Sequence, residues 1–230
     1  MKTIGLLGGM SWESTIPYYR LINEAVKQRL GGLHSAKLLL HSVDFADIEV
    51  CQRTGDWAAA GAQLAQGARG LQAAGADLLL IGANTMHKVA PAIEAAVDIP
   101  LLHVADATAQ AIRAAGVTRV GLLGTRFTME QAFYVERLAS HGLDVRVPPP
   151  ADRDEVHRVI YAELCLGRME TASRAMFRRV MADLVADGAQ GIILGCTEIG
   201  LLVEAADSTV PQFDTTRLHA LAAVEAALAG

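Results

Sequence analysis

A cysteine, a threonine and a glutamate follow one another directly after an apolar run in the second half of the chain. The run from Gly191 to Gly195 reads Gly-Ile-Ile-Leu-Gly, and Cys196, Thr197 and Glu198 come next. A buried strand that ends in a thiol and a carboxylate can deliver a nucleophile or a proton-transferring base to a site. A helix that starts just after the strand would lower the thiol pKa and favour the thiolate. A buried, inert cysteine is the alternative interpretation.

The same pattern occurs earlier in the chain without the thiol. A forward shift of 113 positions places Gly82 on Gly195 and Ala83 on Cys196. Two facing loops of this kind can hold acid and base groups on opposite faces of one carbon, which is what inversion by removal and return of a proton requires. Because Ala83 carries no exchangeable proton, one half of such a pair is missing.

Hydrogen-bonding side chains follow the ends of several apolar runs. They are neutral donors, which can hold a carboxylate without being titrated themselves. Each one taken alone fits a helix cap equally well. The candidates are Asn84, Thr85, Thr125, Thr128 and Thr197, together with the glycine-rich loop at residues 9–11.

The elements that must position these loops alternate between strands and helices. Strands are predicted over residues 3–8, 37–43, 77–83, 99–104, 119–125, 143–147, 190–195 and 210–214, and the main helices end near residues 26, 74, 140, 165, 187 and 229. Such alternation predicts parallel sheets, whose ligands bind beyond the carboxyl ends of the strands. The run at residues 4–8 recurs 116 positions later. We therefore predict an α/β fold with two pseudo-symmetric lobes, residues 1–104 plus 215–230 and residues 105–214, and an active site between them.

Composition excludes several classes of function. The net charge of −5 provides no basic stripe for nucleic acid, and no apolar run reaches the roughly 18 residues that span a membrane. Three cysteines without a C-x-x-C pair favour a reducing, cytoplasmic compartment, and seven scattered histidines do not predict a metal site. The glycine-rich start also lacks the complete nucleotide-binding fingerprints.

Together these segments resemble a known family. The opening Gly5-Leu-Leu-Gly-Gly-Met-Ser-Trp-Glu-Ser-Thr15 and the segments 83–87 and 195–198 are similar to the cofactor-independent aspartate/glutamate racemases, closest to their proteobacterial amino-acid racemase branch. The similarity spans nearly the whole chain. It implies two Rossmann-like lobes, a homodimer, no PLP or metal, and two cysteines as opposed bases. By that resemblance Cys196 is one base, and Ala83 occupies the place of the other.

The resemblance also implies substrate-binding residues. They would hold the carboxylates of a small amino acid or dicarboxylate, and they are Met10, Asn84, Thr85, Thr125, Thr128 and Thr197. Some aspartate racemases carry a lysine near Leu164–Gly167, where this chain has Cys165, so the resemblance implies altered or relaxed side-chain specificity. Arg53 and Arg126 are cationic candidates by loop position, although either also fits a surface residue.

The missing base leaves three explanations for Ala83. It could be an engineered inactivating substitution, or a water or His87 could be the second proton carrier, or the enzyme could use one base. We predict a cytoplasmic, cofactor-independent isomerase that moves the α-proton of aspartate, glutamate or a broader set of amino acids. Glu198, His87, Arg53 and Cys165 are further site candidates. The alternatives are a single-cysteine decarboxylase or lyase of the same superfamily and a carboxylate-sensing pseudoenzyme.

Overall fold

The computed structural model describes residues 1–229, and the chain divides into two compact units. Unit 1 comprises Met1–Val104 and the residues from His219 onward, and unit 2 comprises Ala105–Leu218. The lobes predicted from the sequence end at residues 104 and 214. The second division of the chain lies after Leu218, inside the last helix.

Unit 1 is built on the three-stranded parallel sheet β2-β1-β3. Its elements, in chain order, are β1 (Ile4–Gly8), α1 (Trp12–Leu30), β2 (Leu38–Ser42), α2 (Phe45–Thr54), α3 (Trp57–Ala73), β3 (Leu78–Ile81), the 3-10 helix η1 (Thr85–Val89) and α4 (Ala90–Glu94), with most of α11 (Thr215–Leu228). The strands β1 and β3 are buried along their whole length, as parallel strands covered on both faces are.

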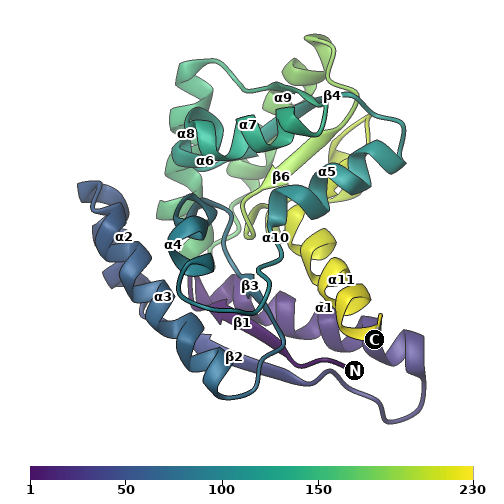
Figure 1. The fold of residues 1–230 in the computed structure, drawn as a ribbon. Helices are drawn as coiled ribbons and strands as arrows, with labels where there is room; N and C mark the ends of the chain where they lie inside the picture. Colours follow the sequence, from purple (N-terminus) through teal and green to yellow (C-terminus); the bar gives the residue numbers. More distant parts are fainter. Residues whose placement is uncertain (230) are drawn as a thin grey trace. The chain divides into compact units, whose positions relative to one another are not determined.

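The alternation of side chains along β1 and β3 explains how helices cover both faces of this sheet. Leu7 and Leu79 pack in one core cluster with residues of α2 and α3. Leu6 and Leu80 point the other way and pack with residues of α1 and α11. Figure 1 shows α3 and α1 on opposite sides of the sheet. The ends of β1 and β3 are thereby held between two hydrophobic layers.

Unit 2 is built on the four-stranded parallel sheet β5-β4-β6-β7. Its elements are α5 (Val104–Ala114), β4 (Arg119–Gly124), α6 (Arg126–Glu130), α7 (Ala132–Ser140), β5 (Asp144–Arg146), α8 (Pro150–Ala162), the 3-10 helix η2 (Leu164–Leu166), α9 (Thr171–Ala186), β6 (Ile192–Gly195), α10 (Ile199–Leu202), the 3-10 helix η3 (Ala205–Asp207) and β7 (Gln212–Asp214). The predicted α/β fold with two parallel sheets is confirmed.

The two sheets share one strand order, as the internal repeats predict. In each unit the first strand lies between the second and the third, and β1 and β4 end at Gly8 and Gly124, 116 positions apart. Unit 1 differs in its fourth strand, which was predicted over residues 99–104. Only one bridge forms there, between Leu79 and Leu101. The ladder stays short because Pro100 has no N–H to donate and α5 begins at Val104.

Two predicted helices also have different bounds. The helix predicted to end near residue 140 is two helices, α6 and α7, because Gln131 between them has an extended backbone. The helix predicted to end near residue 165 is α8, which begins at Pro150, since proline suits the first position of a helix, and ends at Ala162. The separate short helix α6 matters for the site, because it places Thr128 against the ends of β4 and β6.

Candidate active site

Unit 2 brings its two site loops together through glycines at the ends of β4 and β6. A Cβ atom on Gly124 would lie 2.8 Å from the carbonyl oxygen of Gly195, and one on Gly195 would lie 2.8 Å from the oxygen of Leu123. Both positions therefore require glycine. This close approach places Thr128 within 3.5 Å of a Cβ on either glycine, directly beside the loop that carries Cys196.

Thr125 and Thr128, in the segment that follows β4, contact one another. The Thr125 hydroxyl caps α6 by accepting a hydrogen bond from the Thr128 N–H at 3.3 Å, and the two hydroxyl oxygens lie 3.2 Å apart. Both side chains are buried. Capping and substrate binding are not exclusive, because a hydroxyl both donates and accepts.

Cys196 and Glu198 form a close pair. The Cys196 thiol donates a hydrogen bond to Glu198 Oε2 at 2.8 Å, and the Thr197 hydroxyl donates to the same oxygen at 2.8 Å. All three side chains are buried. The carboxylate is the acceptor for the thiol proton, so it can take that proton when the thiol ionises.

The surroundings of Cys196 correct one prediction from the sequence. Burial raises the pKa of the Cys196 thiol well above its ordinary value, and the neighbouring Glu198 and Cys165 raise it further. A helix N-terminus was expected to lower this pKa. The following helix, α10, has only four residues and begins beyond Glu198, so burial and the neighbouring carboxylate outweigh its effect on the pKa. These surroundings favour the protonated Cys196 thiol at neutral pH.

Unit 1 gathers the corresponding loops in the same way. A Cβ on Gly82 would lie 3.2 Å from the oxygen of Leu7, which places the end of β3 against the end of β1. Gly9, with φ 87°, has the oxygen of Val43 2.3 Å from a Cβ position, so this turn accepts only glycine. The predicted residues after these strands are all buried: Met10, Ala83, Asn84 and Thr85.

His87 is directed into the interior of unit 1. Its Nδ1 donates to the carbonyl oxygen of Ala83 at 2.9 Å, and its Nε2 accepts from the N–H of Val104 at 3.2 Å. The side chain is buried. Burial lowers the pKa of His87 well below its ordinary value, as do His103 and His219. Both nitrogens of His87 are therefore engaged by backbone groups, and its burial favours the uncharged ring.

His87 belongs to a buried histidine cluster, which we define as His87, His103 and His219. The ring centroid of His87 lies 4.4 Å from that of His103 and 5.7 Å from that of His219. His219 Nε2 donates to the oxygen of Leu102 at 2.8 Å, so its Nδ1 accepts from the Tyr18 hydroxyl at 2.9 Å. Sequence reasoning missed this cluster, because its members come from three separate segments.

The histidine cluster predicts a loss of stability in acid. Burial lowers the pKa of His219 to about 4, whereas an unfolded histidine titrates near 6.5. Above pH 6.5 neither state binds this proton. Below it the unfolded state does, so the free energy of unfolding falls by about 3 kcal/mol between pH 6.5 and 4. Urea titrations across this range should show a smaller loss for His219→Gln, and the exposed control His34→Gln should match the wild type.

The two predicted arginines lie outside the buried groups. Arg53 is exposed on α2 and pairs with Glu49 at 3.4 Å, and Arg126 is exposed and pairs with Asp154 at 2.8 Å. The neighbour of Arg53, Gln52, is buried and donates from Nε2 to Met86 Sδ at 3.1 Å. Its spacing of four residues from buried Ile48 was the available signal. Gln52 is the polar group that α2 contributes to the core near Ala83.

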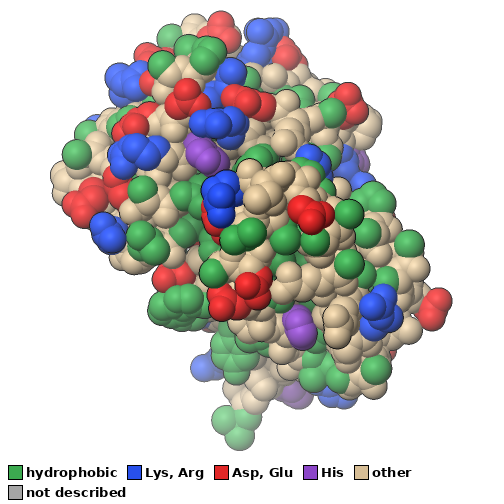
Figure 2. Space-filling model, turned by 90° about the vertical axis from the view of Figure 1, so that its left-hand side faces the viewer, with side chains coloured by type: hydrophobic (Ala, Val, Ile, Leu, Met, Phe, Trp, Pro, Cys, Tyr) green, Lys and Arg blue, Asp and Glu red, His purple; other side chains and the backbone are tan. Residues whose placement is uncertain are grey.

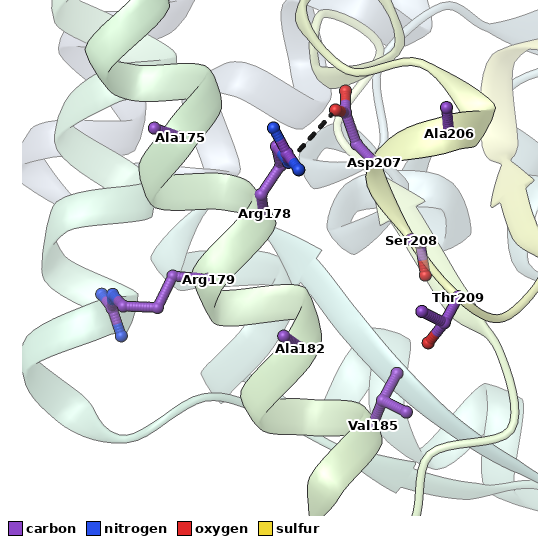
Figure 3. A pocket seen from close by; sticks show the side chains of 9 residues that line it. All are labelled: Ala175, Arg178, Arg179, Ala182, Val185, Ala206, Asp207, Ser208 and Thr209. Carbon is purple, nitrogen blue, oxygen red and sulfur yellow. Dashed lines mark ion pairs between the residues drawn. The ribbon is translucent and has the colours of Figure 1, made fainter.

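A separate cavity of about 420 Å³ lies between α9 and the segment 206–209 in unit 2. Figure 3 shows Arg178 directed towards Asp207, with Ala182 and Val185 forming part of an apolar wall. Asp207 is already bound by Arg174 at 2.7 Å. None of the predicted site residues lines this cavity.

The surface carries charges of both signs (Figure 2). On the face in Figure 2, Lys and Arg side chains are interspersed with Asp and Glu. Within residues 1–229 no group of three or more His, Cys, Asp or Glu side chains is arranged to hold a metal ion. In the same part of the chain, every helix is too short or too polar to cross a membrane.

Comparisons with known proteins agree on one family. The model of the Asp/Glu/hydantoin racemase family matches residues 7–223. A crystal structure assigned to the Asp/Glu racemases, from Yersinia pestis, is 58% identical, with 99% of this chain and 100% of the other covered and a TM-score of 0.92. An aspartate racemase homologue from Pyrococcus horikoshii is 33% identical, with 99% of both chains covered and a TM-score of 0.85. The broad specificity amino-acid racemase RacX of Bacillus subtilis is 24% identical over 98% of both chains.

Proposed function

Because the chain belongs to the Asp/Glu/hydantoin racemase family, we propose that it is an amino-acid racemase that works by α-proton transfer without PLP. The observation that carries the proposal is the hydrogen bond from the buried Cys196 thiol to Glu198 at 2.8 Å. The proposed substrates are aspartate, glutamate or a broader set of amino acids. The 24% identity with a broad specificity racemase supports the wider range.

The proposed chemistry starts from the protonated thiol. As Cys196 takes the α-proton, its own proton moves along the existing hydrogen bond to Glu198, so one proton is gained and one is released at sulfur. The electron pair of the broken C–H bond passes into the substrate carboxylate. Protonation of the opposite face of the carbon by a second carrier inverts the substrate. Loss of the Glu198 proton to water, which reprotonates that carrier, then restores the starting state. A carboxylate beside the thiol makes this possible despite the raised pKa of Cys196.

The charge that develops on the substrate carboxylate needs hydrogen-bond donors. We assign this role to buried groups that follow strand ends, where backbone N–H groups and hydroxyls can converge on an anion. In this proposal they are Met10, Asn84, Thr85, Thr125, Thr128 and Thr197. Cys165, in η2, interacts electrostatically with Cys196 and is proposed to border the substrate side chain.

The proposed mechanism requires a second proton carrier on the opposite face of the α-carbon. Ala83 has no proton to give, and both nitrogens of His87 are bound to backbone. A water molecule above Ala83 is therefore the proposed second carrier. The same observation favours a one-base reaction as the second candidate, namely a single-cysteine decarboxylase or lyase. A carboxylate sensor is the third.

Chiral chromatography of amino acids after incubation with the protein tests the proposal. We expect conversion of the L or D form of at least one acidic or broader-range amino acid into its enantiomer. Release of carbon dioxide from disubstituted malonates without inversion of any amino acid would identify the decarboxylase instead. Binding by calorimetry without turnover of any compound would leave the sensor.

The homodimer implied by the family resemblance is also proposed, with an interface that includes α1. Trp12, Ile16 and Tyr19 lie on one face of this helix and are 62%, 55% and 58% exposed. Exposed apolar stripes of this kind mark interaction surfaces. In light scattering we expect the mass of a dimer for the wild type and of a monomer for Trp12→Glu. A Trp12→Glu protein with the dimer mass would exclude this face.

A further inference from the structure

We propose that the junction between β7 and α11, at Asp214 and Thr215, positions the loop that carries Cys196. The inference rests on the proposed function, in which Cys196 transfers the proton. Thr215 contacts the chain before Cys196, and Asp214 contacts the chain after it. Neither residue is assigned a contact with substrate. They are positioning residues, and they act through the backbone that holds the thiol against Glu198.

Thr215 holds the strand that enters the loop. Its hydroxyl donates to the carbonyl oxygen of Leu194 at 2.8 Å, and both residues are buried. Leu194 and Asp214 are the last pair in the register of β6 and β7. The hydrogen bond from Thr215 adds one contact between β6 and the chain beyond β7. It binds Leu194, which lies two residues before Cys196.

Asp214 holds the segment that leaves the loop. Its Oδ1 caps α11 by accepting from the N–H groups of Thr216 at 2.9 Å and Arg217 at 3.2 Å. Its other oxygen, Oδ2, faces α10, where a Cβ on Gly200 would lie only 2.8 Å away. Gly200 is thus packed against a carboxylate that the start of α11 holds in place.

These two contacts enclose a short segment. Leu194 is two residues before Cys196 and Gly200 is four residues after it, so the loop is fixed at both ends by neighbouring residues of one junction. Glu198 lies between the fixed ends. The 2.8 Å distance from the thiol to Glu198 therefore depends on both contacts, and a displacement of about 1 Å can cost about 10²-fold in rate.

Thr215→Val tests the first contact, because it keeps the shape of the side chain and removes the donor. We expect the pH midpoint of Cys196 alkylation, measured by mass spectrometry of the Cys196 peptide, to fall towards the ordinary thiol value. We expect kcat for α-proton exchange to fall about tenfold or more with KM nearly unchanged. Thr215→Ser keeps the hydroxyl and should restore both values. The exposed Thr209→Val is the matched control and should match the wild type.

Gly200→Ala tests the second contact with its own rescue. The added methyl group should displace the loop and lower the alkylation midpoint as Thr215→Val does. Asp214→Ser keeps a capping side chain and shortens it, so Gly200→Ala combined with Asp214→Ser should recover the wild-type midpoint. Wild-type midpoints in folded Thr215→Val and Gly200→Ala proteins would overturn the inference. Alkylation needs no substrate, so its result stands apart from any failure of the proposed racemase activity.

Discussion

Ala83→Cys is expected to increase the rate of amino-acid inversion by about 10²-fold or more, because it supplies the acid/base group that the first repeat lacks. Ala83 is buried. It lies two residues after the end of β3, and Cys196 lies directly after the end of β6. A thiol at this position carries a proton at near-neutral pH, whereas the methyl group of alanine carries none. Initial rates from each enantiomer, followed by circular dichroism, measure the effect.

Matched variants separate this gain from a change in packing. Ala83→Ser introduces a side chain similar in size to cysteine, but its alcohol stays protonated. We therefore expect little increase in the rate of inversion. Ala83→Cys combined with Cys196→Ser should lose inversion again, since one base then remains. If Ala83→Cys folds, binds substrate and inverts no faster than the wild type, Ala83 does not stand in the place of a base.

Glu198→Gln should change thiol reactivity and catalysis in opposite directions. Loss of the negative charge lowers the pKa of Cys196, because the carboxylate is one of the causes that raise it. We therefore expect faster alkylation of Cys196 at pH 7. Proton exchange at the α-carbon should fall by about 10²-fold or more, because the acceptor for the thiol proton is lost.

The exposed carboxylate Glu136 provides the control for that result. Glu136→Gln should leave alkylation and exchange as in the wild type. A Glu198→Gln protein that exchanges α-protons at the wild-type rate would remove Glu198 from the mechanism. The Cys196 thiol would then have to ionise in its buried surroundings without a proton acceptor beside it.

Much of the architecture could be predicted from repeats and glycines. The offsets of 116 and 113 relate glycines that end β1, β4 and β6 in the structure, at Gly8, Gly124 and Gly195, and Gly82, which directly follows β3. These glycines predict close approach of the chain, and in the structure a Cβ on Gly124 or Gly195 would meet a backbone oxygen at 2.8 Å. The loops with Thr125, Thr128 and Cys196 meet in unit 2 because parallel strands end on one edge of a sheet.

Other features depend on contacts that local patterns do not contain. Burial and the Glu198 carboxylate raise the thiol pKa against expectation, and a turn, not a long helix, follows Cys196. His87 turns inward because residues 85–89 form a 3-10 helix whose histidine binds backbone groups at Ala83 and Val104. The contact of Thr215 with Leu194 joins residues 21 positions apart. Contacts between residues this far apart in the sequence are set by the tertiary fold and not by local sequence patterns.

Exchange of the α-proton in deuterium oxide, followed by NMR for each enantiomer of aspartate and glutamate, tests the role of Cys196 most directly. We predict that the wild-type protein replaces this proton with deuterium and that Cys196→Ser loses the exchange by about 10²-fold or more. Cys196→Ser keeps the size of the side chain and a hydrogen bond to Glu198, so binding should persist. Exchange at the wild-type rate in Cys196→Ser, or binding of substrate by the wild type without any exchange, would contradict the assignment of Cys196 as the proton-transferring group.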